Sequence, residues 1–461
     1  MPTPTPDTIF ARASGAGKAG VAVYRLSGPF SWRIGALLSK RSVTDRAPKL
    51  AKVFDPGTAE AIDEGLILAF KGPASFTGED VVEFHLHGSR AVEAAFGAAA
   101  LKAGARLAEP GEFTRRAFLN GKIDLAQVEA LSDLIDAETS SQRRQALGQF
   151  GGRLSDLAEG WRGQLISIMA ALEADIDFPD EEGVPAAVAA QAGPKIEALA
   201  ADLREHVTKS SGARRLREGV EAVIIGAPNA GKSSLLNALA GADVAIVSSI
   251  AGTTRDVIET RLDLGGVAVL IADTAGLGGP TADPIEREGA RRARARAETA
   301  DVRIMVIDPL AEELAPSGGT AGRGDVAEVQ SVAAMLRPGD FLLYSKRDLG
   351  GAPAPAPDGV ARFHVSAKTS AGMPEFLAAL ESRARDLAGG SEGAAFTRLR
   401  HVEAGKRALA ALDRARERLP TAAELAAEDV RLAARALMSI TGAVDVEDVL
   451  AEIFASFCIG K

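Results

Sequence analysis

The segment Gly226–Ser233 reads GAPNAGKS and matches the pattern G-x-x-x-x-G-K-[ST]. It follows the apolar run Val223–Ile225, which is typical of a buried strand, and it precedes Ser234–Leu239, which has a helical pattern. Between a strand and a helix, such glycines let backbone N–H groups turn toward a phosphate, and the helix N-terminus adds positive potential. We therefore predict a phosphate-binding loop, with Lys232 on the β- and γ-phosphates and the Ser233 hydroxyl on Mg²⁺.

Strand-like runs alternate with helix-like runs on the C-terminal side of this loop. Such alternation predicts βαβ units and a mostly parallel sheet. We expect strands at Val223–Ile225, Val267–Ala272, Val302–Ile307, Phe341–Tyr344 and Phe363–Val365. This part of the chain is therefore predicted to be an α/β domain.

Three further motifs follow the loop in order, each directly after one of these strands. They are DTAG at Asp273–Gly276, SKRD at Ser345–Asp348 and SAK at Ser366–Lys368. Because ligands bind at the carboxyl ends of the strands in open α/β sheets, the four motifs predict one site. The set resembles the GTPase superfamily, and a carboxylate at Asp348 suits the ring N–H and the exocyclic amine of guanine. Ser345 stands where asparagine is usual, so we expect it to lose contacts that brace the base-binding loop. This leaves the guanine affinity open, and the guanine preference less so.

The residue after DTAG is Leu277, which cannot orient a water molecule as the glutamine of Ras-type GTPases does. Glu286, in the following segment PIEREG, is our candidate for that role, although a glutamate at a helix start is commonly only solvated. Thr254 is the expected Mg²⁺ ligand of the first switch segment. The side-chain carbonyl of Asn229, with loop carbonyls, could hold a monovalent cation that supplies the charge of an arginine finger.

The chain on either side of the α/β domain has other patterns. Residues 1–120 are typical of an α+β domain, with strands at Gly20–Leu26 and Asp80–Leu86 and a helix at Arg90–Lys102. We expect four segments: 1–120, the N-terminal domain; 121–217, the first part of an all-α domain; 218–382, the inserted α/β domain; and 383–461, the second part of the helical domain.

A helical pattern begins after Lys122, where Asp124 and Gln127 have the spacing of a capping box. Further helical patterns lie at Arg143–Leu147, Leu154–Ile176, Lys195–His206 and Val446–Phe457. An insertion of the α/β domain into this helical part is feasible where the entry and exit of the inserted chain lie close together.

Composition limits the compartment and the kind of partner. The 461 residues carry 53 Lys and Arg against 62 Asp and Glu, a net charge of −9, which argues against coating nucleic acid by bulk charge attraction. The single cysteine, Cys458, excludes an intramolecular disulfide and a Cys-rich zinc site and favours a cytoplasmic protein. We find no signal-peptide pattern and no apolar run of about 18 residues, so we expect no membrane span.

The chain resembles one family, the tRNA-modifying GTPases called MnmE or TrmE, over essentially its whole length. The segments that carry the resemblance, with the motifs above, are Asp7–Ala11 (DTIFA), Gly20–Gly28 (GVAVYRLSG), Ser75–Gly88 (SFTGEDVVEFHLHG), Pro110–Leu125 (PGEFTRRAFLNGKIDL), Asp177–Glu181 (DFPDE) and Phe457–Lys461 (FCIGK). The resemblance implies a multidomain protein: an α+β folate-binding N-terminal domain that helps form a homodimer, an all-α helical domain, and an inserted Ras-like P-loop GTPase domain.

The resemblance also implies a reaction and partners. Members act with the flavoprotein MnmG (GidA), in a heterotetramer or larger complex, on the wobble uridine of certain tRNAs. They add an aminomethyl or carboxymethylaminomethyl group at C5 of that base, using 5-formyltetrahydrofolate or a related tetrahydrofolate. Their GTP hydrolysis needs K⁺ and the pairing of two GTPase domains.

Residue by residue, the resemblance and the motifs assign roles to the following positions. Glu286 is catalytic; Ser233 and Thr254 bind Mg²⁺; Asn229, Ser248, Ile250 and Thr253 bind K⁺; Arg25, Glu83, Lys122 and Lys461 bind the folate. The GTP-binding residues are Asn229, Ala230, Gly231, Lys232, Ser233, Ser234, Ser248, Ser249, Ile250, Ala251, Gly252, Thr253, Thr254, Asp273, Thr274, Ala275, Gly276, Ser345, Lys346, Asp348, Ser366, Ala367 and Lys368.

Several alternatives stay open at this level. His85 and His87 lie on one face of a strand, as a metal pair or as packed, hydrogen-bonded side chains. Cys458 is either a catalytic thiol or a structural cysteine. A regulatory GTPase switch in ribosome assembly explains Leu277 and the GTPase motifs equally well, but not the N-terminal domain. A third interpretation is a folate-dependent one-carbon transferase with a regulatory GTPase domain.

Overall fold

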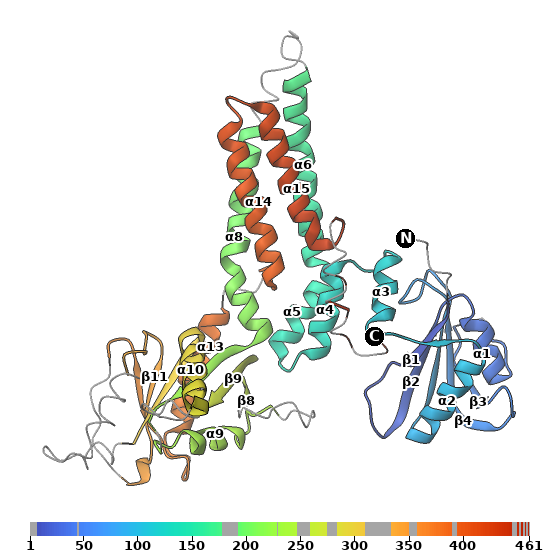
Figure 1. Cartoon of the computed structure of the whole chain (residues 1–461), viewed down its shortest axis with the longest axis horizontal. Helices are drawn as coiled ribbons and strands as arrows, with labels where there is room; N and C mark the ends of the chain where they lie inside the picture. Colours follow the sequence, from blue (N-terminus) through green and yellow to red (C-terminus); the bar gives the residue numbers. More distant parts are fainter. Residues whose placement is uncertain are drawn as a thin grey trace, which may run out of the picture. The chain divides into compact units, whose positions relative to one another are not determined.

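The computed structural model describes residues 7–43, 46–177, 192–227, 229–246, 259–273, 284–308, 333–349, 357–389 and 394–444, together with residues 450, 453, 454, 457 and 460. Side chains are described at all of these positions except 174–177, 259 and 284–290. Contacts divide the chain into two compact units, the first of residues 1–132, 149–170 and 427–461 and the second of residues 133–148 and 171–426 (Figure 1). The domain boundaries expected after residues 120, 217 and 382 remain a prediction.

The first unit contains a six-stranded sheet. Its strand order is β3 (Lys49–Phe54), β4 (Ala61–Phe70), β5 (Val81–Gly88), β2 (Ala19–Ser27), β1 (Ile9–Arg12) and β6 (Arg106–Leu107). All neighbours are antiparallel except β1 and β6, which are parallel. The two strands predicted in this domain are confirmed as β2 and β5, whereas the other four were not predicted.

Two helices cover one face of this sheet, α1 (Ser31–Ser39) and α2 (Arg90–Lys102), and α2 has the predicted bounds. Aromatic rings fill the space beneath α2, with Phe96 4.8 Å from Tyr24 and 5.1 Å from Phe84 between ring centroids. Burying such a ring contributes about 1.5–3 kcal/mol, so these contacts hold α2 firmly on the strands.

Helices make up most of the remaining chain outside the second sheet. They are α3 (Glu112–Leu119), α4 (Leu125–Asp136), α5 (Ser140–Phe150), α6 (Arg153–Asp177), α8 (Ala192–Glu218), α14 (Leu399–Arg418) and α15 (Ala423–Thr441). The capping box is confirmed, because the Gln127 N–H donates to Asp124 Oδ1 over 2.8 Å and the Asp124 N–H donates to Gln127 Oε1 over 3.0 Å. None of the helices that the structure describes is long and apolar enough to cross a membrane.

The C-terminal segment contributes to the first unit. Phe454 and Phe457 are buried against Val128 of α4. Gly460 lies directly on the Arg12 carbonyl at the end of β1, where a Cβ would come within 1.9 Å of that oxygen. Most of the predicted helix Val446–Phe457 lies outside the described residues.

The second unit contains the α/β sheet. Its order is β12 (Ala361–His364), β11 (Phe341–Tyr344), β10 (Val302–Ile307), β7 (Val220–Ile225), β9 (Val267–Asp273) and β8 (Glu259–Leu264). The strands are parallel apart from β8, which runs antiparallel to β9. This confirms the predicted βαβ arrangement. The antiparallel edge strand β8 was not predicted.

Helices lie on both faces of this sheet. Leucines of α9 (Lys232–Ala240) and Phe376 of α13 (Met373–Ala388) are buried against one face. Ala297 of α10 (Pro284–Thr299) is buried against the other, together with Met305 and Tyr344. Because both faces are covered, the inner strands β7, β9, β10 and β11 are largely apolar, as expected for a parallel sheet.

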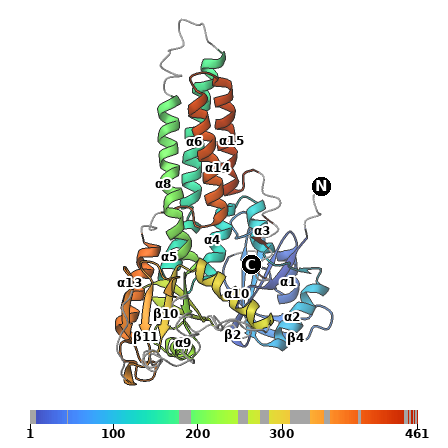
Figure 2. The ribbon, with the colours of Figure 1, turned by 60° about the vertical axis from the view of Figure 1, so that its left-hand side comes forward.

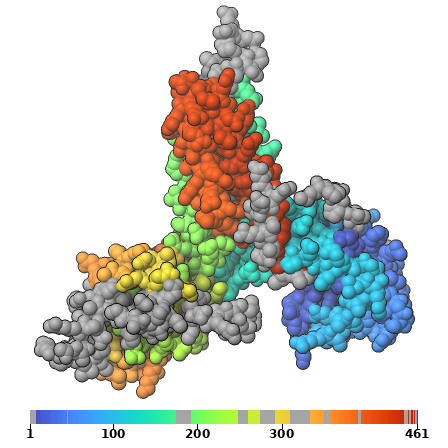
Figure 3. Space-filling model, viewed as in Figure 1, coloured from blue at the N-terminus to red at the C-terminus, as the bar shows by residue number. Residues whose placement is uncertain are grey.

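The chain enters and leaves the α/β region at neighbouring points. It enters through Gly219, which follows α8 with φ 96°. It leaves at the end of α13, where a Cβ on Gly212 of α8 would lie 3.2 Å from the Gly389 carbonyl oxygen. Figure 2 shows α13 beside the lower end of α8, and Figure 3 shows α14 (orange-red) lying along α8 (green). This geometry accommodates the α/β region between two helical segments.

Candidate functional site

The phosphate-binding loop has the predicted shape. It begins at Gly226, directly after β7, with φ 149°, and a Cβ there would come within 2.3 Å of the Val306 carbonyl oxygen on β10. Gly231 is the N-cap of α9, with φ 99°, and Asn229 also has a positive φ, 62°. Only glycine tolerates the close approach at Gly226, so the first glycine of the motif is required by packing.

Lys232 lies in the first turn of α9 and points back into this loop. Its Nζ donates to the carbonyl oxygens of Gly226, at 2.9 Å, and Ala227, at 2.8 Å. The ammonium is therefore held inside the loop, at the positive N-terminal end of α9, where anions are favoured.

The next two predicted residues meet across the site. The Ser233 hydroxyl donates to Asp273 Oδ2 over 2.9 Å, which joins the start of α9 to the end of β9. The second oxygen, Asp273 Oδ1, is buried and has no hydrogen-bond partner among the described residues. A hydroxyl and a carboxylate with a spare oxygen are the hard donors that Mg²⁺ prefers, so these residues fit that ion.

Ser345 makes a direct contact with the phosphate-binding loop, because its hydroxyl donates to the Ala230 carbonyl oxygen over 2.8 Å. The effect of serine in place of asparagine on guanine affinity stays a prediction. Ser345 is 8% exposed, and its N–H donates to the Ile307 carbonyl at the end of β10. The residue therefore ties the base-binding segment directly to the phosphate-binding loop.

The last two motifs meet at Asp348. The buried Ser366 hydroxyl donates to Asp348 Oδ1 over 2.6 Å, and this hydrogen bond lowers the pKa of Asp348 below its ordinary value. The Thr369 N–H donates to the same hydroxyl over 3.2 Å. Lys346 is held by Asp308 over 2.5 Å. The Asp348 carboxylate is thus ionised and oriented at an exposed position, as a base-recognition group must be.

Other predicted residues of this site fall outside what the structure describes. They are Ser248, Ser249, Ile250, Ala251, Gly252, Thr253, Thr254, Thr274, Ala275 and Gly276. Glu286 lies in the first turn of α10, but its side chain is not among those described. Ser234 and Asn229 are exposed, and Ala367 and Lys368 directly follow Ser366. The roles predicted for all of these residues stay predictions.

A second set of predicted residues lies on the N-terminal sheet. Arg25 on β2 is directly opposite Glu83 on β5, and the two side chains pair over 2.8 Å. The Arg25 guanidinium also lies over the rings of Phe76, at 5.6 Å, and Phe113, at 5.8 Å. Such a half-buried ion pair beside aromatic faces suits a flat, polar ligand.

Lys122 belongs to the same unit, and its side chain lies beside Gly78, two residues after Phe76. Lys461 and Cys458 lie outside the described residues. Gly460, which is described, contacts the Arg12 carbonyl at the end of β1.

The two histidines form separate pairs. His85 Nε2 lies 3.3 Å from Glu83 Oε2, whereas His87 Nδ1 donates to Asp63 Oδ1 over 2.8 Å. No group of three potential metal ligands occurs in the part of the chain that the structure describes. Both histidines thus make the side-chain hydrogen bonds that the second interpretation expects.

Our sequence analysis missed an ionic network in the N-terminal unit. Arg106 and Arg116 both contact Asp7 and Glu112, with distances of 2.5 to 2.9 Å, and Arg116 also reaches Glu79 at 3.1 Å. Burial acts to raise the pKa of Asp7 and of Glu112, but hydrogen bonds from the two arginines lower both below their ordinary values. Only the i,i+4 spacing of Glu112 and Arg116 is visible in the sequence.

Comparison with known proteins assigns the family. A model described as the MnmE helical domain matches residues 125–458, and a model described as the GTP-binding protein TrmE N-terminus matches residues 8–122. The tRNA modification GTPase MnmE of Caulobacter vibrioides is 49% identical over 462 residues, covering 99% of this chain and 100% of that protein. The protein of the same name from Parvibaculum lavamentivorans is 50% identical over 459 residues, with coverage of 99% and 100%.

Among solved structures, Aquifex aeolicus Era bound to GDP and aluminium fluoride is 25% identical over 36% of this chain and 56% of its own, with a TM-score of 0.27. That score is too low to carry an argument, whereas the sequence matches extend over nearly the whole chain. The chain therefore belongs to the MnmE family of tRNA modification GTPases.

Proposed function

We propose that this chain hydrolyses GTP and couples hydrolysis to tRNA modification. Family membership supports both statements. The observation that carries the GTPase part is the convergence of Lys232, Ser233, Asp273 and the Asp348–Ser366 pair at the carboxyl ends of the parallel strands. Such an edge is where open α/β sheets bind nucleotides.

The described residues have distinct roles toward GTP. Lys232 leaves the loop carbonyls to bind the β- and γ-phosphates, and the carboxylate of Asp348 accepts hydrogen bonds from the guanine edge. Ser233 and Asp273 would hold Mg²⁺, which, when bound, offsets charge that develops on the phosphates. Ser345 links the base-binding segment to the phosphate-binding loop through its hydrogen bond to the Ala230 carbonyl.

Hydrolysis requires an oriented water molecule that attacks the γ-phosphorus while the bond to GDP breaks. Leu277 cannot orient it, so we propose Glu286, at the start of α10, as the residue that does. We further propose K⁺, bound by Asn229, Ser248, Ile250 and Thr253, as the charge that replaces an arginine finger.

The test of this mechanism is GTP turnover by the full chain in KCl and in NaCl. We expect faster turnover in KCl, and we expect Glu286→Ala to keep GDP affinity while lowering turnover about 10²–10⁴-fold. Glu298→Ala, an exposed glutamate near the other end of α10, is the matched control. Equal rates in both salts would refute the role of K⁺ in hydrolysis. A normal turnover number for the Glu286 variant would refute the role of Glu286 in orienting water.

The tRNA part of the proposal includes partners. We propose that a homodimer acts in the cytoplasm with a MnmG-type flavoprotein to add an aminomethyl or carboxymethylaminomethyl group at C5 of the wobble uridine. Mass analysis of tRNA nucleosides from cells lacking the chain tests this. Loss of the modified uridine, restored by the wild-type chain but not by Asp348→Asn, is the expected result. A normally modified wobble uridine in those cells would favour the ribosome-assembly alternative.

We propose that the one-carbon unit comes from a tetrahydrofolate bound by Arg25, Glu83, Lys122 and Lys461. The Arg25–Glu83 pair, with the Arg25 guanidinium beside the Phe76 and Phe113 rings, supports a flat ligand with a polar edge. Titration of the full chain with 5-formyltetrahydrofolate should show saturable binding that Glu83→Gln weakens at least tenfold. Equal affinity of the wild-type chain and the Glu83→Gln variant for 5-formyltetrahydrofolate would show that Glu83 does not bind the folate.

A further inference from the structure

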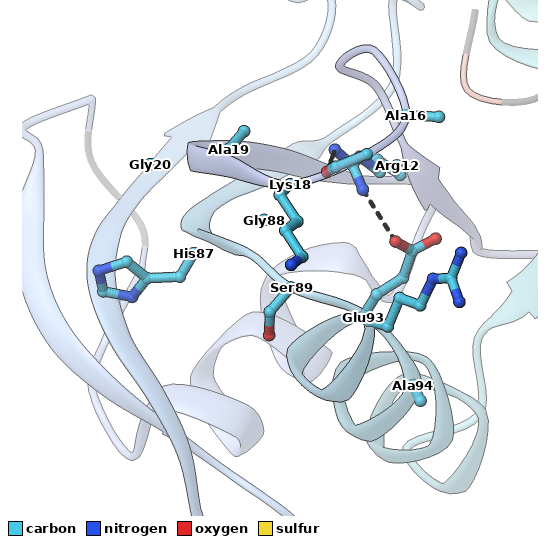
Figure 4. Close-up of a pocket in the computed structure, with 12 residues that line it drawn as sticks. Arg12, Ala16, Lys18, Ala19, Gly20, His87, Gly88, Ser89, Glu93 and Ala94 are labelled. Atoms are coloured by element: carbon cyan, nitrogen blue, oxygen red, sulfur yellow. Dashed lines mark hydrogen bonds and ion pairs between the residues drawn. The ribbon is translucent and has the colours of Figure 1, made fainter.

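An open pocket of about 1240 Å³ lies at one end of the N-terminal sheet, and neither Arg25 nor Glu83 lines it (Figure 4). The turn between β1 and β2, including Gly17 and Lys18, forms one side of it. The end of β5 and the first turn of α2 form the other. The pocket therefore does not include the Arg25–Glu83 pair of the proposed folate site.

Arg12 makes one wall of this pocket rigid. Its guanidinium pairs with Glu93 over 2.9 Å, as Figure 4 shows, and donates to the carbonyls of Gly15, at 2.5 Å, and Gly17, at 2.9 Å. The side chain is only 11% exposed. Arg12 thus balances the carboxylate that lines the pocket and holds the glycine-rich turn in place.

Two further cations in the lining have no such partner. Lys18 and Arg90 are exposed, and neither forms a hydrogen bond or an ion pair with any residue that the structure describes. Figure 4 shows the Lys18 side chain extending toward Ser89, the N-cap of α2. With Glu93 already paired, the pocket has a net positive charge.

The first turn of α2 adds to this potential. The Ser89 side chain accepts from the Val92 N–H over 3.2 Å, and its carbonyl accepts from the Glu93 N–H. The N–H groups of Arg90 and Ala91 have no acceptor among the described residues. Free N–H groups at the positive end of a helix are donors suited to an anion.

Two buried polar atoms next to the pocket are also unpartnered. Tyr24, opposite Arg12 across β1 and β2, is 2% exposed, and its hydroxyl has no hydrogen-bond partner in the described chain. The same holds for Arg12 Nε. Burial and the charge of Glu93 raise the pKa of Tyr24, so its hydroxyl stays a neutral donor. These two unpaired atoms are buried beside Arg12 and Glu93, which line the pocket, and add polar character behind that wall.

We propose that this pocket binds a phosphate group, and that the phosphate belongs to the backbone of a tRNA. The positive charge of the lining and the free N–H donors of α2 support a phosphate ligand. The assignment of that phosphate to tRNA rests on the proposed function. A chain with net charge −9 needs a local positive site to hold a polyanion, and a lysine, an arginine and a helix N-terminus are common phosphate ligands. A small phosphorylated molecule is the other source of the same chemistry.

The experiment compares tRNA binding by the full wild-type chain and by Lys18→Ala/Arg90→Ala across a range of salt concentrations. We expect the double variant to bind about tenfold more weakly, with a salt slope smaller by about one to two. The matched control is Arg33→Ala/Lys52→Ala, which removes the same charge from exposed positions of the same domain outside the pocket. Both double variants should unfold at the wild-type temperature, because the substituted side chains are exposed.

A second measurement locates the contact. Acetylation of Lys18 and Lys52 in the wild-type chain is followed by mass spectrometry with tRNA or with inorganic phosphate. Protection of Lys18 alone by tRNA supports the proposal. Protection by inorganic phosphate but not by tRNA would refute the RNA assignment in favour of a small phosphorylated ligand. If neither tRNA nor inorganic phosphate protects Lys18, and the two double variants have equal salt slopes, the proposed phosphate site is refuted.

These outcomes separate the pocket from the proposed function. If the wild-type chain modifies tRNA normally but Lys18→Ala/Arg90→Ala binds tRNA as tightly as the wild type, the proposed function stands and the tRNA contact at the pocket is refuted. A wild-type chain without any tRNA affinity refutes the tRNA contact, whereas the nucleoside analysis decides the proposed function. Protection of Lys18 by phosphate then decides whether the pocket binds that group.

Discussion

At Ser345 a hydroxyl occupies the position where GTPases commonly have an asparagine amide, and it still reaches the phosphate-binding loop. The bond to the Ala230 carbonyl is buried, so no water can replace it if the hydroxyl is lost. A buried acceptor left without a donor costs about 1–3 kcal/mol. A single small side chain therefore couples the two ends of the nucleotide site.

We expect Ser345→Ala to weaken GDP binding roughly 5- to 150-fold, which is that free-energy range expressed as an affinity. Thr369→Ala is the control, because Thr369 is exposed and contacts the site only through its backbone N–H. Titration with a fluorescent GDP analogue measures both. Wild-type affinity for the Ser345 variant would show that the hydroxyl bond contributes nothing to the bound state.

At the scale of elements, helix α10 links the proposed catalytic residue to the parallel sheet. Its first turn carries Glu286, and near its other end Arg296 pairs with Glu221 of β7 over 2.7 Å. Just beyond α10, Asp301 pairs with Arg215 of α8 over 2.6 Å. These ion pairs anchor one end of a helix whose other end is proposed to act on water.

We expect Glu221→Arg, which places two like charges together, to lower GTP turnover about 3- to 10-fold with little change in GDP affinity. Such partly exposed pairs are worth only about 1 kcal/mol, so a larger loss is not expected. The double variant Glu221→Arg/Arg296→Glu should recover most of the rate. If the double variant is no faster than the single one, the pair does not position α10.

At the scale of the whole molecule, the two compact units can be observed separately. Both tryptophans of the chain, Trp32 and Trp161, belong to the first unit. Their fluorescence therefore reports the unfolding of the unit that holds the Asp7, Glu112 and Arg116 network. That network lowers the pKa of both carboxyl groups in the folded chain.

The sign of the resulting pH dependence follows from these shifts. A carboxyl group with a lowered folded-state pKa stabilises the fold above its unfolded-state pKa, and this stability disappears as pH falls through the folded-state pKa. We expect the urea midpoint of tryptophan fluorescence to be constant above about pH 5 and to fall below pH 4. Glu112→Gln should lower the midpoint at pH 7 and flatten its acid decline. An unchanged acid profile in this variant would exclude Glu112 as a source.

Much of the α/β fold could be predicted because its signals are local. Short apolar runs such as Phe341–Tyr344 indicate strands, and each GTPase motif directly follows one of them, so chain order alone places the motifs at one edge. The strands β3 and β4 were missed, because single propensities at solvated positions are weak.

The sequence by itself determined the domain types, the phosphate-binding loop and the family. Only the tertiary structure decided which distant groups come together. Arg303 of β10 pairs with the buried Asp340, the Ser345 hydroxyl bonds the Ala230 carbonyl, and Lys18 lines one pocket with the first turn of α2. The reason is physical. Local backbone preferences are carried by neighbours in the chain, whereas ion pairs, braces and pockets depend on packing that brings together residues far apart in sequence.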